Sequence, residues 1–236
     1  MITSAPCAAT SFDARFMSSD LVSIDAPLTP EAVARIRAHK IKQVSIEKGA
    51  TQDIFDDKSL FAKLETVSLN CDDEANCYMM KSLSQHYPKI RELSLTQSQP
   101  LSAQALAELK SFQRLSFLSL NADIYDGKLL LKDIPEGLQD LRLESPNATS
   151  WKFPVMQNLR TLKIWNAPIS AEFLTSLRAP QLNDLTFGDG VDPRSYQALK
   201  RFGKLRHLFI MKDHVDGPNY ALLRSLKLKQ LVCHHD

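Results

Sequence analysis

The chain has 236 residues, of which 44% are hydrophobic and 24% charged, which is typical of a globular protein long enough to bury a sizeable core. Its 29 basic and 27 acidic residues leave a net charge of +2, a balance that does not indicate a nucleic-acid or membrane-surface partner. No segment approaches the roughly 18 uninterrupted apolar residues of a membrane span. The first residues lack a basic stretch followed by an apolar one, so we predict no cleaved signal peptide.

The N-terminal part of the chain begins with a segment of low periodicity. Residues 1–17 are rich in Ser, Ala and Thr and are predicted to form a tail or an N-terminal cap. A strand is expected at residues 21–25. A helix should begin at Pro30, because Thr29 is a good N-cap and proline fits the first helical position. Residues 74–87 are expected to form the longest helix.

Later links between strands divide into helical and irregular ones. Helices are expected after Ser102, Ser170 and Asp192, where apolar pairs three or four residues apart follow a capping side chain. Residues 121–137 and 145–156 contain Gly and Pro at turn-forming places, so extended chain and turns are predicted there. We therefore expect a regular array at both ends and an irregular stretch between them.

One pattern, apolar-x-x-apolar-x-apolar, recurs along almost the whole chain. A weak copy begins at Ser19 with Val22 and Ile24, and nine clear copies follow it. These are Ile41/Val44/Ile46, Leu64/Val67/Leu69, Ile90/Leu93/Leu95, Leu115/Leu118/Leu120, Leu138/Leu141/Leu143, Leu159/Leu162/Ile164, Leu182/Leu185/Phe187, Leu205/Leu208/Ile210 and Leu228/Leu231/Cys233. Successive copies start 21 to 26 residues apart, and such a period predicts a solenoid in which stacked units share one core. We expect one repeat domain, residues 18–236.

This register resembles the leucine-rich repeat family, whose repeats read L-x-x-L-x-L-x-x-N. The resemblance implies an α/β solenoid of about ten repeats, with a parallel sheet on the concave side and helices or irregular chain on the convex side. The helical links are similar to those of the ribonuclease-inhibitor and F-box-associated types and of bacterial effectors. No copy has the family's ladder Asn three places after the third apolar residue, so the turns must be stabilised in another way.

The residues between the triplet positions are predicted to face the concave side, because neighbours on a strand point to opposite faces. The middle column begins with a run of serines, Ser45, Ser68, Ser94 and Ser119. We interpret these as small side chains that relieve crowding, in preference to a phosphate site. Large side chains follow toward the C-terminus, and these types are enriched at binding hot spots. The predicted protein-binding residues are Phe117, Arg142, Lys163, Trp165, His207, Phe209 and Met211. The alternative is that they cover one another on an inert face.

No catalytic, cofactor-binding or metal-ligating residues are predicted. Cys233, His234, His235 and Asp236 are adjacent, but neighbouring strand residues point apart and no second ligand group lies at metal-site spacing. No Ser or Cys has a nucleophile motif, and no Gly-rich loop opens a helix in phosphate-binding form. Cys71 and Cys77 could meet in one loop, although free thiols are the favoured interpretation. An enzyme is kept only as a minor alternative.

The expected function is a non-enzymatic module that binds a protein partner of unknown identity through its concave face. Family resemblance adds a bacterial effector, acting in the cytoplasm or delivered into a host cell. The alternative function is a substrate-recognition subunit of a ubiquitin ligase. Basic residues before the strands are interpreted as a solvated rim, with no nucleic acid and no membrane as partners: Lys40, Lys42, Arg91, Arg160, Arg206 and Lys229. A monomer is expected, and self-association through residues 228–233 is the alternative.

Overall fold

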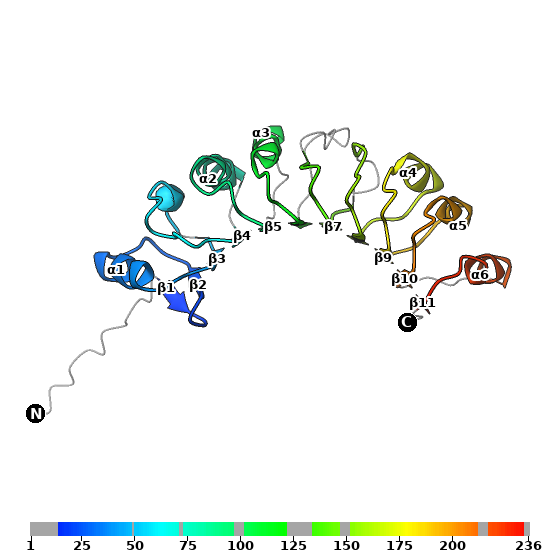
Figure 1. The fold of residues 1–236 in the computed structure, drawn as a ribbon, viewed down its shortest axis with the longest axis horizontal. Helices are drawn as coiled ribbons and strands as arrows, with labels where there is room; N and C mark the ends of the chain where they lie inside the picture. The colour runs from blue at the N-terminus through cyan, green and yellow to red at the C-terminus, as the bar shows by residue number, and fades with distance from the viewer. Residues whose placement is uncertain are drawn as a thin grey trace, which may run out of the picture.

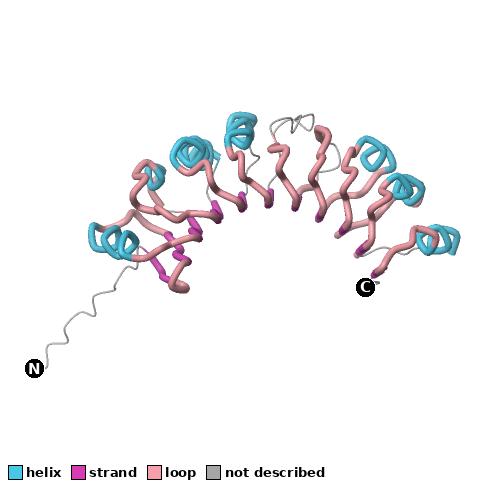
Figure 2. Tube along the Cα trace, viewed as in Figure 1, coloured by secondary structure: helices cyan, strands magenta, loops and turns pink. Residues whose placement is uncertain are grey.

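The computed structural model describes residues 14–48, 50–70, 73–96, 102–121, 134–146, 152–211 and 217–233. The chain forms a curved solenoid in which the strands line the inner arc and the helices lie on the outer arc (Figure 1, Figure 2). Consecutive strands in the sequence are neighbours in space, so the sheet runs in chain order from β1 to β11.

The sheet has eleven strands. They are β1 Ala14–Phe16, β2 Leu21–Ile24, β3 Gln43–Ile46, β4 Thr66–Asn70, β5 Glu92–Thr96, β6 Phe117–Asn121, β7 Asp140–Glu144, β8 Thr161–Trp165, β9 Asp184–Phe187, β10 His207–Ile210 and β11 Gln230–Cys233. β1 pairs with β2 in the antiparallel sense, and all later pairs are parallel. The parallel strands β2 to β11 correspond one to one with the ten copies of the sequence pattern. The predicted leucine-rich repeat solenoid is confirmed.

The convex side carries short helices. They are α1 Pro30–Ala38, η1 Gln52–Phe55, α2 Asp73–His86, α3 Ala103–Ala107, η2 Glu108–Ser111, α4 Ala171–Ser176, α5 Ser195–Ala198, η4 Leu199–Arg201 and α6 Gly217–Arg224. With 14 residues, α2 is the longest helix that the structure describes, as predicted. Of the two predicted irregular links, residues 134–137, 145–146 and 152–156 are described and contain no helix, and residue 121 is the last of β6; the rest lies outside the described residues.

Three of the four predicted helix starts have the expected cap. The side chains of Thr29, Ser102 and Ser170 accept hydrogen bonds from backbone N–H groups three residues later, at 3.2, 3.2 and 3.1 Å. The fourth start was wrong. Asp192 Oδ1 accepts from the Arg194 N–H at 3.0 Å and so closes a turn, and α5 begins only at Ser195.

The core is the stack of triplet side chains. From β2 to β10 the second and third apolar residues of each repeat are buried, as are the first residues from Ile41 to Leu205. Leu162 and Ile164 in β8, for example, are 0% exposed. The last repeat differs, because Leu228, Leu231 and Cys233 are only partly buried.

A ladder of backbone hydrogen bonds joins neighbouring repeats where the strands begin. The Arg160 carbonyl accepts from the N–H groups of Asn183 at 2.8 Å and Asp184 at 2.9 Å. The same two-to-one arrangement recurs at every step between parallel strands. The accepting carbonyls belong to Asp20, Lys42, Glu65, Arg91, Ser116, Gln139, Arg160, Asn183 and Arg206. Main-chain atoms thus satisfy the entry to each strand. After the strands, side chains also join neighbouring repeats: Asn70 Nδ2 donates to Glu47 Oε2 at 2.7 Å and Asn166 Nδ2 to Glu144 Oε1 at 3.2 Å.

Candidate functional site on the concave face

The concave face is divided into two halves by the register of its middle column. Ser23, Ser45, Ser68, Ser94 and Ser119 lie opposite one another across β2 to β6. From β7 onward the same column holds Arg142, Lys163, Thr186, Phe209 and Val232. Because parallel strands keep these positions in register, side-chain size increases abruptly at β7.

A hollow of about 480 Å³ lies on the half with large side chains, across β7 to β10. It is lined by Asp140, Thr161, Lys163, Trp165, Asp184, Thr186, Phe209 and Met211. Its volume is within the range of about 300–1,000 Å³ that is common for ligand sites. Aromatic and Met side chains provide apolar walls, and two carboxylates and one ammonium group add charge.

The Trp165 ring packs against Gly188, the residue that follows β9. A Cβ atom built at Gly188 would lie only 2.1 Å from Trp165 Cε3, so the indole ring packs directly on the glycine backbone. Trp165 is half-buried and lines the hollow. The ring is pre-positioned at low entropic cost, which favours its use as a binding anchor.

A hydrogen-bonded cluster borders the hollow at β9 and β10. His207 Nδ1 lies 2.5 Å from Asp184 Oδ1, and Asn183 Nδ2 donates to Asp184 Oδ2 at 2.7 Å. Both carboxylate oxygens thus have partners. His207 is half-buried and serves to orient Asp184 beside the hollow.

Arg142 connects the hollow to β6. Its guanidinium lies 4.6 Å from the centroid of the Phe117 ring, and its Nε lies 3.6 Å from Asp140 Oδ1. That separation is too long for a hydrogen bond, and the buried Asp140 Oδ1 has no hydrogen-bond partner in the described structure. Burial raises the pKa of the Asp140 carboxyl above its ordinary value, and the Arg142 and Lys163 charges oppose that rise.

The seven predicted binding residues occupy one continuous region. Four of them, Lys163, Trp165, Phe209 and Met211, line the hollow, and His207 contacts a fifth lining residue. Arg142 and Phe117 stack beside it.

Sequence reasoning did not select four lining residues, Asp140, Thr161, Asp184 and Thr186. The sequence pattern did contain a signal for three of them. One column of the sheet, at the first position of each strand, holds Asp140, Thr161, Asp184 and His207. Two acids are thus separated by one hydroxyl on neighbouring strands. Gly188 was a second signal, because it follows Trp165 in its column.

Metal sites and membrane-spanning helices were also considered among the described residues. Within the described ranges, no group of three or more His, Cys, Asp and Glu side chains could hold a metal ion. Residues 234–236, which follow Cys233, lie outside the described residues, as do the side chains of Cys71 and Cys77. No helix among the described residues is both long and apolar enough to cross a bilayer.

Comparisons with known proteins add one structural likeness. No protein-family model matches the chain, and no curated protein matches it. Among solved structures, the chain is similar to an internalin (inlF) from Listeria monocytogenes, with a TM-score of 0.39 and 15% identity over 88% of this chain and 72% of that chain. The assignment of a leucine-rich repeat fold rests on the strand order, register and core described above.

Proposed function

We propose that the protein is a non-enzymatic interaction module that binds a protein partner on the half of the concave face formed by β7 to β10. The observation that supports this proposal is the hollow lined by Trp165, Phe209 and Met211 beside the charged side chains Lys163 and Asp184. Apolar anchors seated among polar groups are the typical composition of an interface hot spot.

The chemistry of the hollow suggests how a partner would be held. Trp165 and Phe209 offer apolar walls to an aliphatic or aromatic side chain. Lys163 is available to an acidic group, whereas Asp184 is already paired with His207. A partner segment that follows the arc would meet the anchors on β8 and β10 and the serines on the earlier strands.

The test compares two pairs of substitutions on the same face. Trp165→Ala with Phe209→Ala removes the apolar walls, and Ser68→Ala with Ser94→Ala is the control in the serine half. In affinity capture with quantitative mass spectrometry, we expect the first variant to lose its specific partners by about tenfold or more, as for hot-spot residues. The serine variant should retain them.

An unchanged set of partners for the aromatic variant would contradict the proposal. Circular dichroism and the unfolding midpoint must show that this variant is folded, so that a loss of binding reports on the surface. Purified partner and isothermal titration would then give the affinity of the wild-type and both variants.

Two narrower roles are part of the proposal and depend on the identity of the captured proteins. A bacterial effector role predicts capture of host-cell proteins, together with delivery of the protein into host cells. The role of a substrate-recognition subunit predicts capture of a ubiquitin-ligase adaptor on a separate chain. The same capture experiment distinguishes the two.

A further inference from the structure

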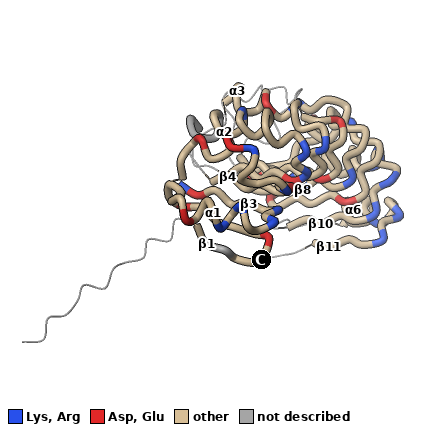
Figure 3. The backbone as a smooth tube through the Cα atoms, turned by 60° about the vertical axis from the view of Figure 1, so that its left-hand side comes forward, with Lys and Arg blue, Asp and Glu red and all other residues tan. Residues whose placement is uncertain are grey.

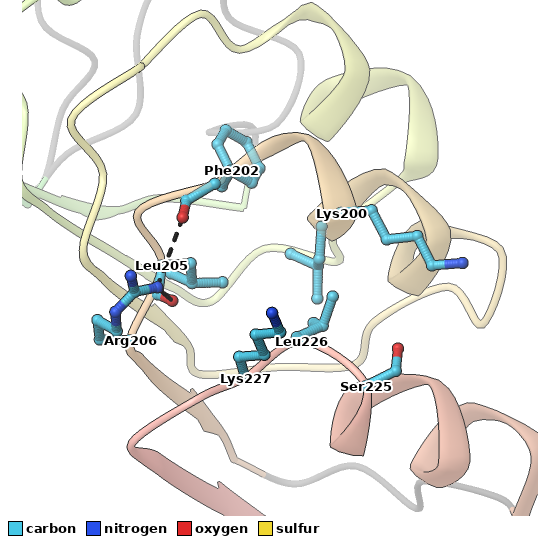
Figure 4. Close-up of a pocket in the computed structure, with 9 residues that line it drawn as sticks. Lys200, Phe202, Leu205, Arg206, Ser225, Leu226 and Lys227 are labelled. Atoms are coloured by element: carbon cyan, nitrogen blue, oxygen red, sulfur yellow. Dashed lines mark hydrogen bonds between the residues drawn. The ribbon is translucent and has the colours of Figure 1, made fainter.

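A second hollow, of about 430 Å³, lies between the last two repeats and away from the concave hollow. It is lined by Leu199, Lys200, Phe202, Gly203, Leu205, Arg206, Ser225, Leu226 and Lys227. One wall comes from η4 and the turn before β10, and the other comes from the turn that follows α6 (Figure 4).

This hollow exists because the last repeat lacks a large side chain. Three residues before the first apolar position, four earlier repeats have a buried aromatic residue, Phe61, Tyr87, Phe112 or Phe202, and one has the buried Met156. Ala38, Pro135 and Ala179 are smaller exceptions. The last repeat has Ser225 there, and it is exposed. The place that an aromatic ring fills in four earlier repeats is thus open to an outside group.

The turn of the last repeat is also different. In earlier repeats the N–H of the first apolar residue bonds to the carbonyl three residues before it, as Leu205 does with Phe202 at 3.0 Å. In the last repeat the bond from Ser225 to Leu222 matches that from Phe202 to Leu199, but the next described bond runs from Leu226 to Leu223 and not from Leu228 to Ser225. Lys227 then adopts a φ of 51°, a conformation that residues other than glycine rarely adopt. Its side chain lies between those of Arg206 and Lys200 (Figure 4).

The described residues around this hollow are rich in cations, of which Arg194 is paired with Asp192 and Arg206 donates to the Leu205 carbonyl at 2.9 Å. The described residues of 193–211 and 217–233 include eight Lys and Arg side chains and no Asp or Glu. Blue segments accordingly gather around α6, β10 and β11 in Figure 3. None of the ion pairs found among the described residues involves Lys200, Arg206 or Lys227. The overall charge of +2 conceals this asymmetry, because acidic residues predominate earlier in the chain.

We propose that this hollow binds an acidic segment of a protein. An apolar side chain of the segment would be seated against Leu205 and Leu226, in the place left open by Ser225, and flanking carboxylates would face Lys200, Arg206 and Lys227. This site is separate from the concave face, so a partner held there would leave the arc open to a second one.

The shape and extent of the cationic surface favour a peptide over other polyanions. A nucleic-acid backbone requires cations along a track, but the row of residues that begins the strands carries Glu65 between Lys42 and Arg91. A flat anionic membrane would meet the lysines without reaching the recessed Leu205, which is 2% exposed. A side chain projecting from a peptide can reach it.

Fluorescence anisotropy with a labelled peptide, Glu-Asp-Glu-Phe-Glu-Asp-Glu, tests the proposal on the full chain. We expect saturable binding that weakens as salt is added. Lys200→Glu with Lys227→Glu should weaken it by about tenfold or more, because two attractive charges become repulsive. The control is Lys110→Glu with Arg114→Glu, which lie at the same repeat positions in an earlier repeat and should leave binding unchanged.

Further arms test the apolar seat and the class of ligand. A peptide with Ser in place of Phe should bind about tenfold more weakly, and Ser225→Phe should weaken binding of the Phe peptide without lowering the unfolding midpoint. Trp165→Ala with Phe209→Ala should bind the peptide as wild type does. The proposal is overturned by absence of saturable binding, by equal loss in the control variant, by equal affinity for the Ser peptide, or by tighter binding to phosphatidylserine vesicles or a single-stranded oligonucleotide.

Discussion

The two halves of the concave face share one architecture and differ in chemistry. β2 to β6 display serines in register, whereas β7 to β10 display Arg142, Lys163, Thr186 and Phe209 at the equivalent places. Below both halves lie the same buried triplets and the same carbonyl ladder. The comparison shows that the positions that build this solenoid are distinct from those that determine what it presents.

The largest expected effect tests whether the two halves have equivalent cores. Leu93→Ala in the serine half and Leu162→Ala in the other half both remove a side chain that is 0% exposed. Each should lower the free energy of unfolding by about 2–5 kcal/mol, from lost apolar burial and the cavity left behind. Urea denaturation measures both. A loss below about 1 kcal/mol in either variant would show that its half is packed differently.

Gly188→Ala should give the next largest effect, in the half with large side chains. The new methyl group meets the Trp165 ring, and displacement of the ring should cost about 1–3 kcal/mol. Gly190→Ala is the control, because a Cβ atom there meets nothing within 4 Å. Trp165 fluorescence in a Trp151→Phe background should change only for Gly188→Ala, and Trp165→Ala should suppress most of the cost. Equal stability of the two glycine variants would contradict the packing described here.

Asp140→Asn should have a smaller effect, and one that depends on pH. Burial raises the pKa of Asp140 in the folded state, so the native protein binds more protons than the unfolded chain, and stability falls as pH rises through that pKa. The neutral amide removes this dependence. Asp140→Asn should therefore stabilise the fold by under about 1 kcal/mol at pH 7, since solvent screens a partly exposed group, and by less at pH 3.

Asp184→Asn provides the contrast for that measurement. Asp184 has partners for both carboxylate oxygens, His207 and Asn183, so its amide variant should be less stable than wild type at pH 7. Thermal unfolding at pH 7 and pH 3 shows whether each substitution raises or lowers the stability. A destabilised Asp140→Asn protein at pH 7 would show that the Arg142 and Lys163 charges outweigh burial.

The smallest effect is expected in the serine half. Ser94→Ala changes a half-buried hydroxyl on the concave face and should alter stability by less than about 0.5 kcal/mol. Ser94→Phe is the more informative substitution, because it tests the interpretation that small side chains relieve crowding between β4 and β6. It should destabilise by about 1–3 kcal/mol if that interpretation holds. No change would leave the serines without a packing role.

Much of the fold could be predicted from the sequence because its signals are local and repeated. The spacing of triplets such as Leu159/Leu162/Ile164 determined strand order and register, and Thr29, Ser102 and Ser170 marked helix starts that the structure confirms. Asp192 misled because an Asp can close a turn as readily as it caps a helix.

The surface was harder to predict because it depends on relations between repeats. That Trp165 lies on Gly188, and that Ser225 opens a hollow, follow from comparing equivalent positions on neighbouring strands. The net charge of the whole chain, +2, likewise gave no sign that cations are concentrated in the last two repeats. The grouping of Asp140 and Asp184 needed the register of three strands, which a pattern within one repeat does not give.

The ladder of carbonyls has a consequence for how such a chain can change. Each step uses only main-chain atoms, with one acceptor and two donors, so any residue other than proline at either donor position can supply it. The side chains of residues such as Lys42, Gln139 and Arg160 are not needed for the spacing of the strands. Whole repeats should therefore be exchangeable between positions in the array. Surface side chains can change in this way while the hydrogen bonds between strands are retained.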